Sequence, residues 1–148
     1  MGDFSVEVSD SGGLDEFAAK LARLTSQDAI NRINDAAGAA VKDRVDLEFQ
    51  RGEDPYGNAW LATRAGNSPP LTGPTRDLRG SVRYEVTGKG FLILVTDWKA
   101  IFHQGGTRRG LPARPMLPVN GALPAQWSYA MDLAVKAELE AILGLGST

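Results

Sequence analysis

The feature that most constrains this chain is a stretch of apolar residues at helical spacing between positions 26 and 51. Its apolar side chains recur every three or four residues, which is the period of an amphipathic helix. They are Ile30, Ile33, Ala37, Val41, Val45 and Phe49. Ser26 is placed to cap the first turn, and Gly52 is placed to end the last one. The pattern predicts one long helix with a single buried stripe, against which the rest of the chain must pack.

A β-hairpin is predicted downstream of this helix. Val82, Tyr84 and Val86 alternate with polar residues, and a turn at Gly88-Lys89-Gly90 then leads into the apolar run 91–95. Alternation followed by a turn that contains glycine is typical of a hairpin. Because the second strand is apolar on both faces, we expect it to be the more buried of the pair.

Further elements are predicted around these two. They are a strand over 4–8, a helix over 14–24 with Leu14, Phe17, Ala18 and Leu21 on one stripe, and a helical turn near 75–79. A final helix should begin at Leu123-Pro124 and end at Gly144. Its inward stripe should comprise Trp127, Ala130, Met131, Ala134, Ala137 and Ala141. The chain is thus predicted to be one α+β domain over 1–148, with a small antiparallel sheet packed against the long helix and the C-terminal helix.

Two segments rich in proline and glycine are predicted to be long functional loops, 53–74 and 103–118. The first opens with a turn at Asp54-Pro55-Tyr56-Gly57, after which Trp60 should anchor it to the core. The second lies largely within the stretch 102–115, which we expect to be too rich in glycine and proline to form a helix or a central strand. Loops held on a rigid scaffold often carry recognition.

Composition excludes several classes of site. The absence of cysteine rules out disulfides, thiolate metal sites and thiol nucleophiles. A single histidine cannot hold zinc, and the carboxylates lack ligand spacing, so we expect no metal and no cofactor. No apolar run reaches the roughly 20 residues that span a bilayer, and the first residues lack the basic segment of a signal peptide. We therefore expect a cytoplasmic protein with no membrane partner.

Acidic and basic residues are segregated along the chain. Residues 1–63 carry six basic and twelve acidic side chains, whereas residues 64–114 carry nine basic and three acidic ones. Complementary patches of this kind could favour head-to-tail contact between copies. The alternative is that both signs lie intermingled on one folded surface.

Five short motifs follow the long helix in order. They are Asp54-Pro55-Tyr56-Gly57-Asn58-Ala59-Trp60, Leu71-Thr72-Gly73, Leu78-Arg79-Gly80-Ser81, Ile101-Phe102-His103-Gln104-Gly105-Gly106 and Pro112-Ala113-Arg114-Pro115. With the long helix and the hairpin, they make residues 14–142 resemble the phage virion morphogenesis (tail completion) family of Mu-like tailed phages. The chain departs from the family pattern where Gly105 follows Gln104 with no aromatic residue between them. It also departs at Met116-Leu117-Pro118, where the family commonly has an aromatic residue and a glycine.

The resemblance implies a structural role in the virion rather than catalysis. Similar proteins complete the phage tail or join it to the filled head, commonly as a ring of copies. The implied partners are further copies in a hexameric ring, tail-tube proteins and head-connector proteins. The implied location is the host cytoplasm during assembly, and then the neck or the head-proximal end of the tail in the virion. The two long loops would become ordered on contact with a neighbouring ring.

Six loop residues are candidates for these contacts: Tyr56, His103, Gln104, Arg108, Arg109 and Arg114. His103 could be a general base, but a structural histidine bonded to the backbone of its own loop is favoured. Tyr56, at the tip of a turn, is the best aromatic candidate for a partner contact. The tryptophans Trp60, Trp98 and Trp127 are expected to be core anchors.

The arginines have separate predicted roles. Arg114 could bind a carboxylate of a neighbouring subunit or form a salt bridge within its own fold. Arg108 and Arg109 could contact the phosphates of DNA passing through a channel, without reading its sequence. Two alternative functions stay open. One is an assembly factor that is absent from the virion, and the other is a small hydrolase or lyase that uses His103 with Asp97.

Overall fold

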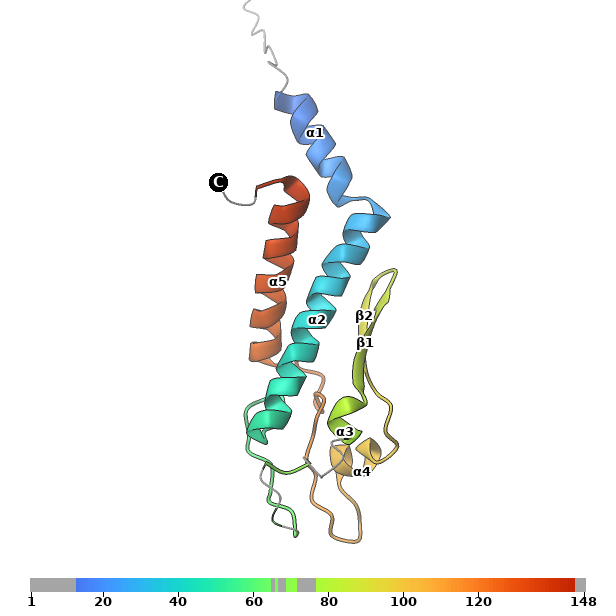
Figure 1. The fold of residues 1–148 in the computed structure, drawn as a ribbon, viewed down its shortest axis with the longest axis vertical. Helices are drawn as coiled ribbons and strands as arrows, with labels where there is room; N and C mark the ends of the chain where they lie inside the picture. The colour runs from blue at the N-terminus through green and yellow to red at the C-terminus, as the bar shows by residue number, and fades with distance from the viewer. Residues whose placement is uncertain (1–12, 65, 67–68, 72–76, 146–148) are drawn as a thin grey trace, which may run out of the picture.

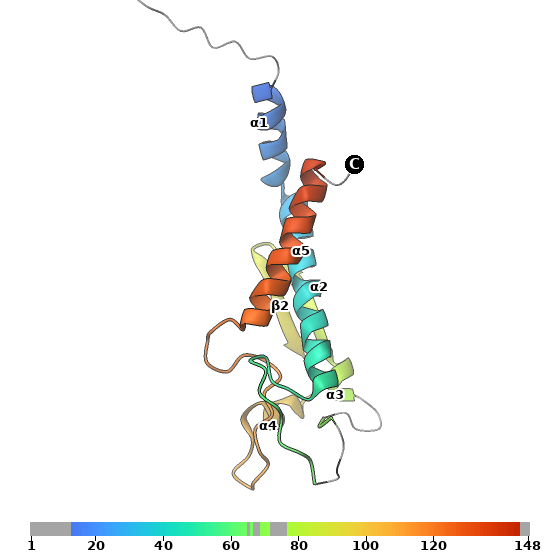
Figure 2. The same ribbon diagram turned by 90° about the vertical axis from the view of Figure 1, so that its left-hand side faces the viewer.

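The computed structural model describes residues 13–64, 66, 69–71 and 77–145. Its architecture is α+β, as the sequence predicts, and its shape is elongated (Figure 1). The elements are α1 (Gly13–Leu24), α2 (Gln27–Arg51), α3 (Asp77–Gly80), β1 (Val82–Thr87), β2 (Gly90–Val95), α4 (Ala100–Gly105) and α5 (Ala125–Leu143). Helix α2 lies between α5 and the hairpin, α1 extends beyond one end of α2, and α3 and α4 lie near its other end (Figures 1 and 2). The predicted strand over 4–8 and residues 72–76 lie outside the described ranges.

Both ends of α2 form as the sequence predicts. Ser26 Oγ accepts a hydrogen bond from the Ala29 amide at 3.1 Å, which satisfies one of the unpaired donors of the first turn. At the other end Gly52 takes a left-handed conformation with φ of 69°, and its amide donates to the Glu48 carbonyl at 2.8 Å. This is the conformation that glycine adopts at the ends of helices without steric cost.

The core follows the predicted stripe of α2. Val41, Val45 and Phe49 are fully buried, and they pack in a cluster with residues from every other part of the described fold except α1. The other buried members are Trp60, Leu78, Val82, Ala100, Met116 and Trp127. The hairpin approaches α2 so closely that a Cβ on Gly38 would lie 2.5 Å from the Tyr84 ring. Glycine at position 38 is therefore what allows helix and sheet to pack.

The hairpin covers α2 with one face only. Antiparallel pairing aligns Val82 with Val95 and Tyr84 with Ile93, so these side chains share the face that meets α2. Most residues of β2 are half-buried while most of β1 are exposed, which confirms that β2 is the more buried strand. Leu92 is nevertheless exposed, because the opposite face of the sheet is covered by no described element.

Helix α5 has the predicted ends and only the first part of the predicted inward stripe, since Ala130 and Ala134 are half-buried. Trp127 is buried and Met131 packs against the core, whereas Ala137 and Ala141 are exposed. The two alanines belong to a ridge of exposed residues at a spacing of four, which runs through Tyr129, Leu133, Ala137 and Ala141. The prediction was wrong for Ala137 and Ala141 because α5 is apolar on most of its faces, so periodicity alone does not select the inward one.

The stretch 102–106 contradicts the prediction of an irregular loop, since most of it belongs to α4. Gly105 is the last residue of that helix and Gly106 follows it with φ of 69°. The two glycines thus end a helix and do not interrupt one, and the first proline lies beyond them at position 112. Gly106 is also required by space, because a Cβ there would lie 2.7 Å from the Leu111 carbonyl oxygen.

Helix α1 forms where predicted, but it buries none of its residues. Leu14, Phe17 and Leu21 remain 63%, 58% and 47% exposed. The opposite side of α1 carries charged residues, including a Glu16–Lys20 ion pair. The apolar stripe that the sequence predicts is therefore present, and it is largely exposed.

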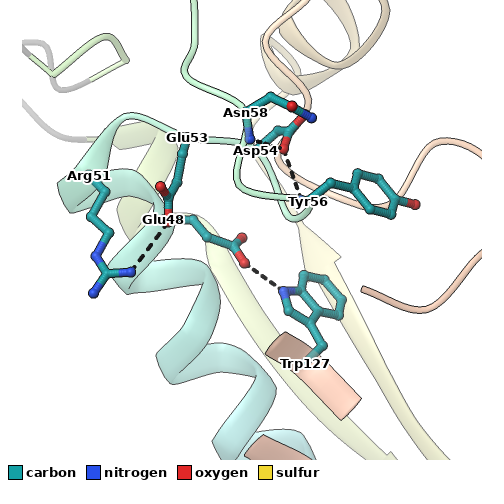
Figure 3. Close-up of polar contacts among 7 residues, drawn as sticks. All are labelled: Glu48, Arg51, Glu53, Asp54, Tyr56, Asn58 and Trp127. Carbon is teal, nitrogen blue, oxygen red and sulfur yellow. Dashed lines mark hydrogen bonds and ion pairs between the residues drawn. The ribbon is translucent and has the colours of Figure 1, made fainter. Parts of the chain in front are cut away.

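A buried carboxyl group links α2 to the start of α5 (Figure 3). Glu48 is 1% exposed, and its Oε1 accepts a hydrogen bond of 2.7 Å from Trp127 Nε1. Its Oε2 is buried with no hydrogen-bond partner among the described residues. Burial raises the pKa of Glu48 from 4.5 to about 7, although the indole hydrogen bond and the charge of Arg44 act in the opposite direction.

Glu48→Gln should remove a pH dependence of stability. Because the folded pKa lies above the unfolded one, the native protein loses stability as the pH rises from 4.5 through about 7. The glutamine keeps an acceptor for Trp127 and carries no charge, so at pH 8 the variant should be more stable by up to roughly 3 kcal/mol. At pH 4 the two proteins should be nearly equal.

Urea denaturation at the two pH values measures this difference. Glu85→Gln, which removes an exposed hairpin carboxylate, is the matched control and should change stability little. A Glu48→Gln variant that is less stable than the native protein at pH 8 would contradict the account.

Candidate functional site

The end of the molecule opposite α1 is built from irregular chain and is the candidate functional site. Residues 53–64, helix α4 and residues 106–124 meet there (Figures 1 and 2). We call this region the loop end. It lacks a β-ladder apart from a single bridge between Glu53 and Ala59, so its backbone groups need other partners. Polar side chains supply several of them.

The first of these side chains is Asp54, which builds the turn that carries Tyr56 (Figure 3). Its Oδ1 accepts hydrogen bonds from the amides of Tyr56 and Asn58, both at 2.9 Å. Tyr56 then reaches across to the segment before α5, where its hydroxyl contacts Asn120 Oδ1 and donates to the Ala122 carbonyl at 3.0 Å. The predicted partner residue Tyr56 is thus half-buried and already engaged within its own chain.

Trp60 joins the loop end to the core, as predicted. Its ring meets Phe49 edge-on with ring centroids 5.3 Å apart. Its Nε1 donates to the Pro115 carbonyl at 2.9 Å. One side chain therefore fixes both the 53–64 segment and the proline-rich segment relative to α2.

Gln104 clamps the backbone that follows Arg114. Its Oε1 accepts from the amides of Met116 and Leu117 at 2.9 and 3.1 Å, and its Nε2 donates to the Leu117 carbonyl at 2.7 Å. An amide side chain suits this position because it offers a donor and an acceptor together. The structure gives Gln104 a role in positioning the loop.

Arg114 occupies neither of the environments predicted for it. The residue is 2% exposed, so it is not available at the surface. Its Nε and Nη2 donate to the carbonyls of Leu61 and Ala62 at 2.6 and 2.8 Å. No carboxylate among the described residues forms an ion pair with it. Arg114 therefore holds the 53–64 segment through backbone carbonyls.

His103 lies beside Arg114 and is not paired with Asp97. The His103 carbonyl accepts from the Arg114 amide at 2.6 Å, whereas its ring Nδ1 is buried with no hydrogen-bond partner among the described residues. Burial, and then the charge of Arg114, lower the pKa of His103. Asp97 instead accepts from the Lys99 amide at 2.9 Å. The dyad that a hydrolase would need is not hydrogen-bonded in this arrangement.

Arg108 and Arg109 form the tip of a tight turn and are exposed, as predicted. The turn is closed by hydrogen bonds from the Gly110 amide to the Thr107 carbonyl and from the Thr107 amide to the Leu111 carbonyl, at 3.1 and 3.0 Å. Neither arginine has an ion-pair partner in the part of the chain that the structure describes.

Two of the three predictions that the tryptophans are core residues are confirmed. Trp60 and Trp127 are core residues, whereas Trp98 is 68% exposed and the prediction for it was wrong. Its ring meets that of Phe102 edge-on at 5.6 Å, and Ile101 beside them is also exposed. Trp98 lies in the short connection between β2 and α4, where no periodic pattern marks a buried position. An apolar groove of about 440 Å³, lined by Ile101, Met116 and Leu117 among others, opens next to this patch.

Sequence reasoning did not identify the exposed ridge of α5 or the role of Arg64. Arg64 is exposed and lines a groove together with Arg109 and Arg114. The segregation of basic residues into 64–114 was the only sequence signal that pointed to such a convergence.

Comparisons with known protein families, with curated proteins and with solved structures found no match to this chain. Within the described ranges, no helix is long and apolar enough to cross a membrane. No group of three or more histidine or acidic side chains among those residues is arranged to hold a metal ion.

Gln104→Ala should loosen the loop end. The change removes one donor and one acceptor that serve three backbone contacts, so we expect a loss of about 2 kcal/mol of stability. Amide hydrogen exchange should become faster at Met116 and Leu117, which lose their acceptor. Gln126→Ala, at an exposed position of α5, is the matched control and should change neither quantity. Unchanged exchange at both amides would show that the clamp does not hold the segment.

Proposed function

We propose that this chain is a structural virion assembly protein that completes a phage tail or joins the tail to the head, as part of a closed ring of copies. The order of its motifs supports the family assignment. The observation that carries the assembly role is the apolar stripe of α1, which is exposed along its whole length. Monomeric proteins rarely leave such a stripe in water, and larger exposed patches mark interaction surfaces.

Helix α1 needs a partner in order to persist. It has 12 residues, and isolated helices of about that length are marginal in water. Among the described elements, its main contacts are with the adjoining ends of α5 and α2 (Figure 1). Covering the exposed parts of Phe17 and Leu21 would contribute about 1 kcal/mol each. The missing surface is therefore expected on another molecule.

The ridge of α5 is the best partner surface for that stripe. Tyr129, Leu133, Ala137 and Ala141 follow the spacing of four that forms a packing ridge on a helix. The small alanines leave room beside the ridge for leucine and phenylalanine side chains. The ridge extends from residue 129 to residue 141, so its length is close to that of α1.

A contact between α1 of one copy and α5 of the next uses two different surfaces. Such heterologous contacts close into a ring when the rotation between copies divides the circle. The family resemblance favours six copies. In this arrangement the loop end, with the exposed Arg108 and Arg109 and the Trp98 patch, is left for tail-tube or head-connector proteins. Attraction between the acidic N-terminal part of one copy and the basic central part of the next could then favour head-to-tail contact.

Phe17→Ser combined with Leu21→Ser should separate the copies. The two changes remove most of the stripe while leaving the charged side of α1 intact, so sedimentation analysis should show a shift from oligomer to monomer. The matched control is Asp15→Ser, which places serine at an exposed position of the same helix and should keep the oligomer. A native protein that remains monomeric at high concentration would contradict the ring.

The assigned place in the virion requires a separate test. In a tailed phage whose copy of this gene carries a stop codon, electron microscopy should show full heads and separate tails. Added native protein should rejoin them, and the double serine variant should not. Normal particles without the protein would overturn the joining role. Absence of the chain from purified virions by mass spectrometry would assign it instead as an assembly factor.

A further inference from the structure

A groove of about 400 Å³ in the loop end gathers positive charge from three separate segments. Arg64 comes from the first loop, His103 from α4, and Arg109 and Arg114 from the second loop. Thr107 and Pro112 are among the other residues that line it. No aspartate or glutamate lines the groove, so the charge of its lining is positive.

The buried arginine makes this charge unusual. Arg114 is 2% exposed, and both of the partners that its guanidinium contacts are neutral carbonyls, those of Leu61 and Ala62. A buried charge without an ion of opposite sign is costly. An anion in the groove beside Arg114 would remove part of that cost.

Two further features fit an anion. Arg64 and Arg109 are exposed and have no ion-pair partner among the described residues, so their guanidinium groups are available to a ligand. The buried Nδ1 of His103 has no hydrogen-bond partner there either. A protonated His103 would give the groove a fourth positive group once an anion offsets the repulsion from Arg114.

We propose that this groove binds a phosphate group. The two exposed guanidinium groups of Arg64 and Arg109, beside the buried charge of Arg114, match a phosphate better than a carboxylate, because a phosphate offers more acceptor oxygens. The inference does not depend on the ring or on a place in a virion. The phosphate can belong to a nucleic acid backbone or to a free phosphate ion, because both present the same oxygens to arginine.

The single histidine of the chain gives a site-specific probe. The ring signals of His103 in an NMR spectrum should shift along a saturating curve when inorganic phosphate is added at constant ionic strength. The affinity should fall about tenfold in Arg64→Ser and in Arg109→Ser, since each removes a hydrogen-bonded charge. Arg108→Ser is the matched control, because Arg108 neighbours Arg109 without lining the groove, and its affinity should stay near the native value.

Each of the other outcomes of this titration either supports or overturns phosphate binding in the groove. If a short DNA duplex displaces inorganic phosphate, the proposal is supported and the bound phosphate belongs to nucleic acid. If phosphate binds and DNA does not displace it, the proposal is supported and the ligand is a free phosphate group. A shift that does not saturate would overturn the proposal. Equal weakening by Arg108→Ser, or acetate that binds as tightly as phosphate, would overturn it as well. Each variant should keep the native circular dichroism spectrum.

Discussion

The loop end depends on one physical constraint: its main chain has almost no ladder of its own, so side chains must satisfy it. Gln104 forms hydrogen bonds with the backbone of Met116 and Leu117, and Arg114 donates to the carbonyls of Leu61 and Ala62. The indole of Trp60 donates to the Pro115 carbonyl. An unpaired buried backbone group costs about 1–3 kcal/mol, so these bonds decide whether the segment has a single shape. They are all made within one copy. The contacts that shape residues 106–118 therefore include several that each copy makes with itself.

The molecule presents two kinds of surface, one at the loop end and one at the opposite half. The loop end presents fixed backbone, an exposed aromatic patch at Trp98 and the basic groove, which suits recognition of a partner without a large ordering cost. The other half of the molecule presents α1 and the outer ridge of α5, which are apolar and simple in shape. Helix α2 runs between the two, and its buried stripe and capped ends hold them at a fixed distance. A protein that joins copies through one half and other components through the other half would have this organisation.

The sequence predicted the elements correctly where local signals, such as helix caps and turns, agree with the periodicity of the apolar residues. Ser26, the stripe of α2 and Gly52 point to the same helix, and the alternation before Gly88 points to the same hairpin. It was insufficient where the outcome depends on distant contacts. Arg114 was expected either at an interface or in a salt bridge within its own fold. It is instead buried against neutral carbonyls, those of Leu61 and Ala62, which lie more than 50 residues away in the sequence. Trp98 was expected in the core and is exposed, because nothing in a short connection marks its direction. Helix α5 is apolar on most of its faces, so its sequence does not indicate which face meets α2.

The chain contains no cysteine, so a single cross-linking experiment can test the central claim that α1 of one copy covers α5 of another. Leu21→Cys and Ala137→Cys are made as separate proteins, mixed, and treated with a short bis-maleimide. The account predicts a covalent dimer that contains one copy of each variant, and a ladder of higher species when both changes are placed in one chain. If the mixture yields no mixed dimer while the double variant cross-links only within itself, α1 folds onto its own α5. The assembly proposed here would then be wrong.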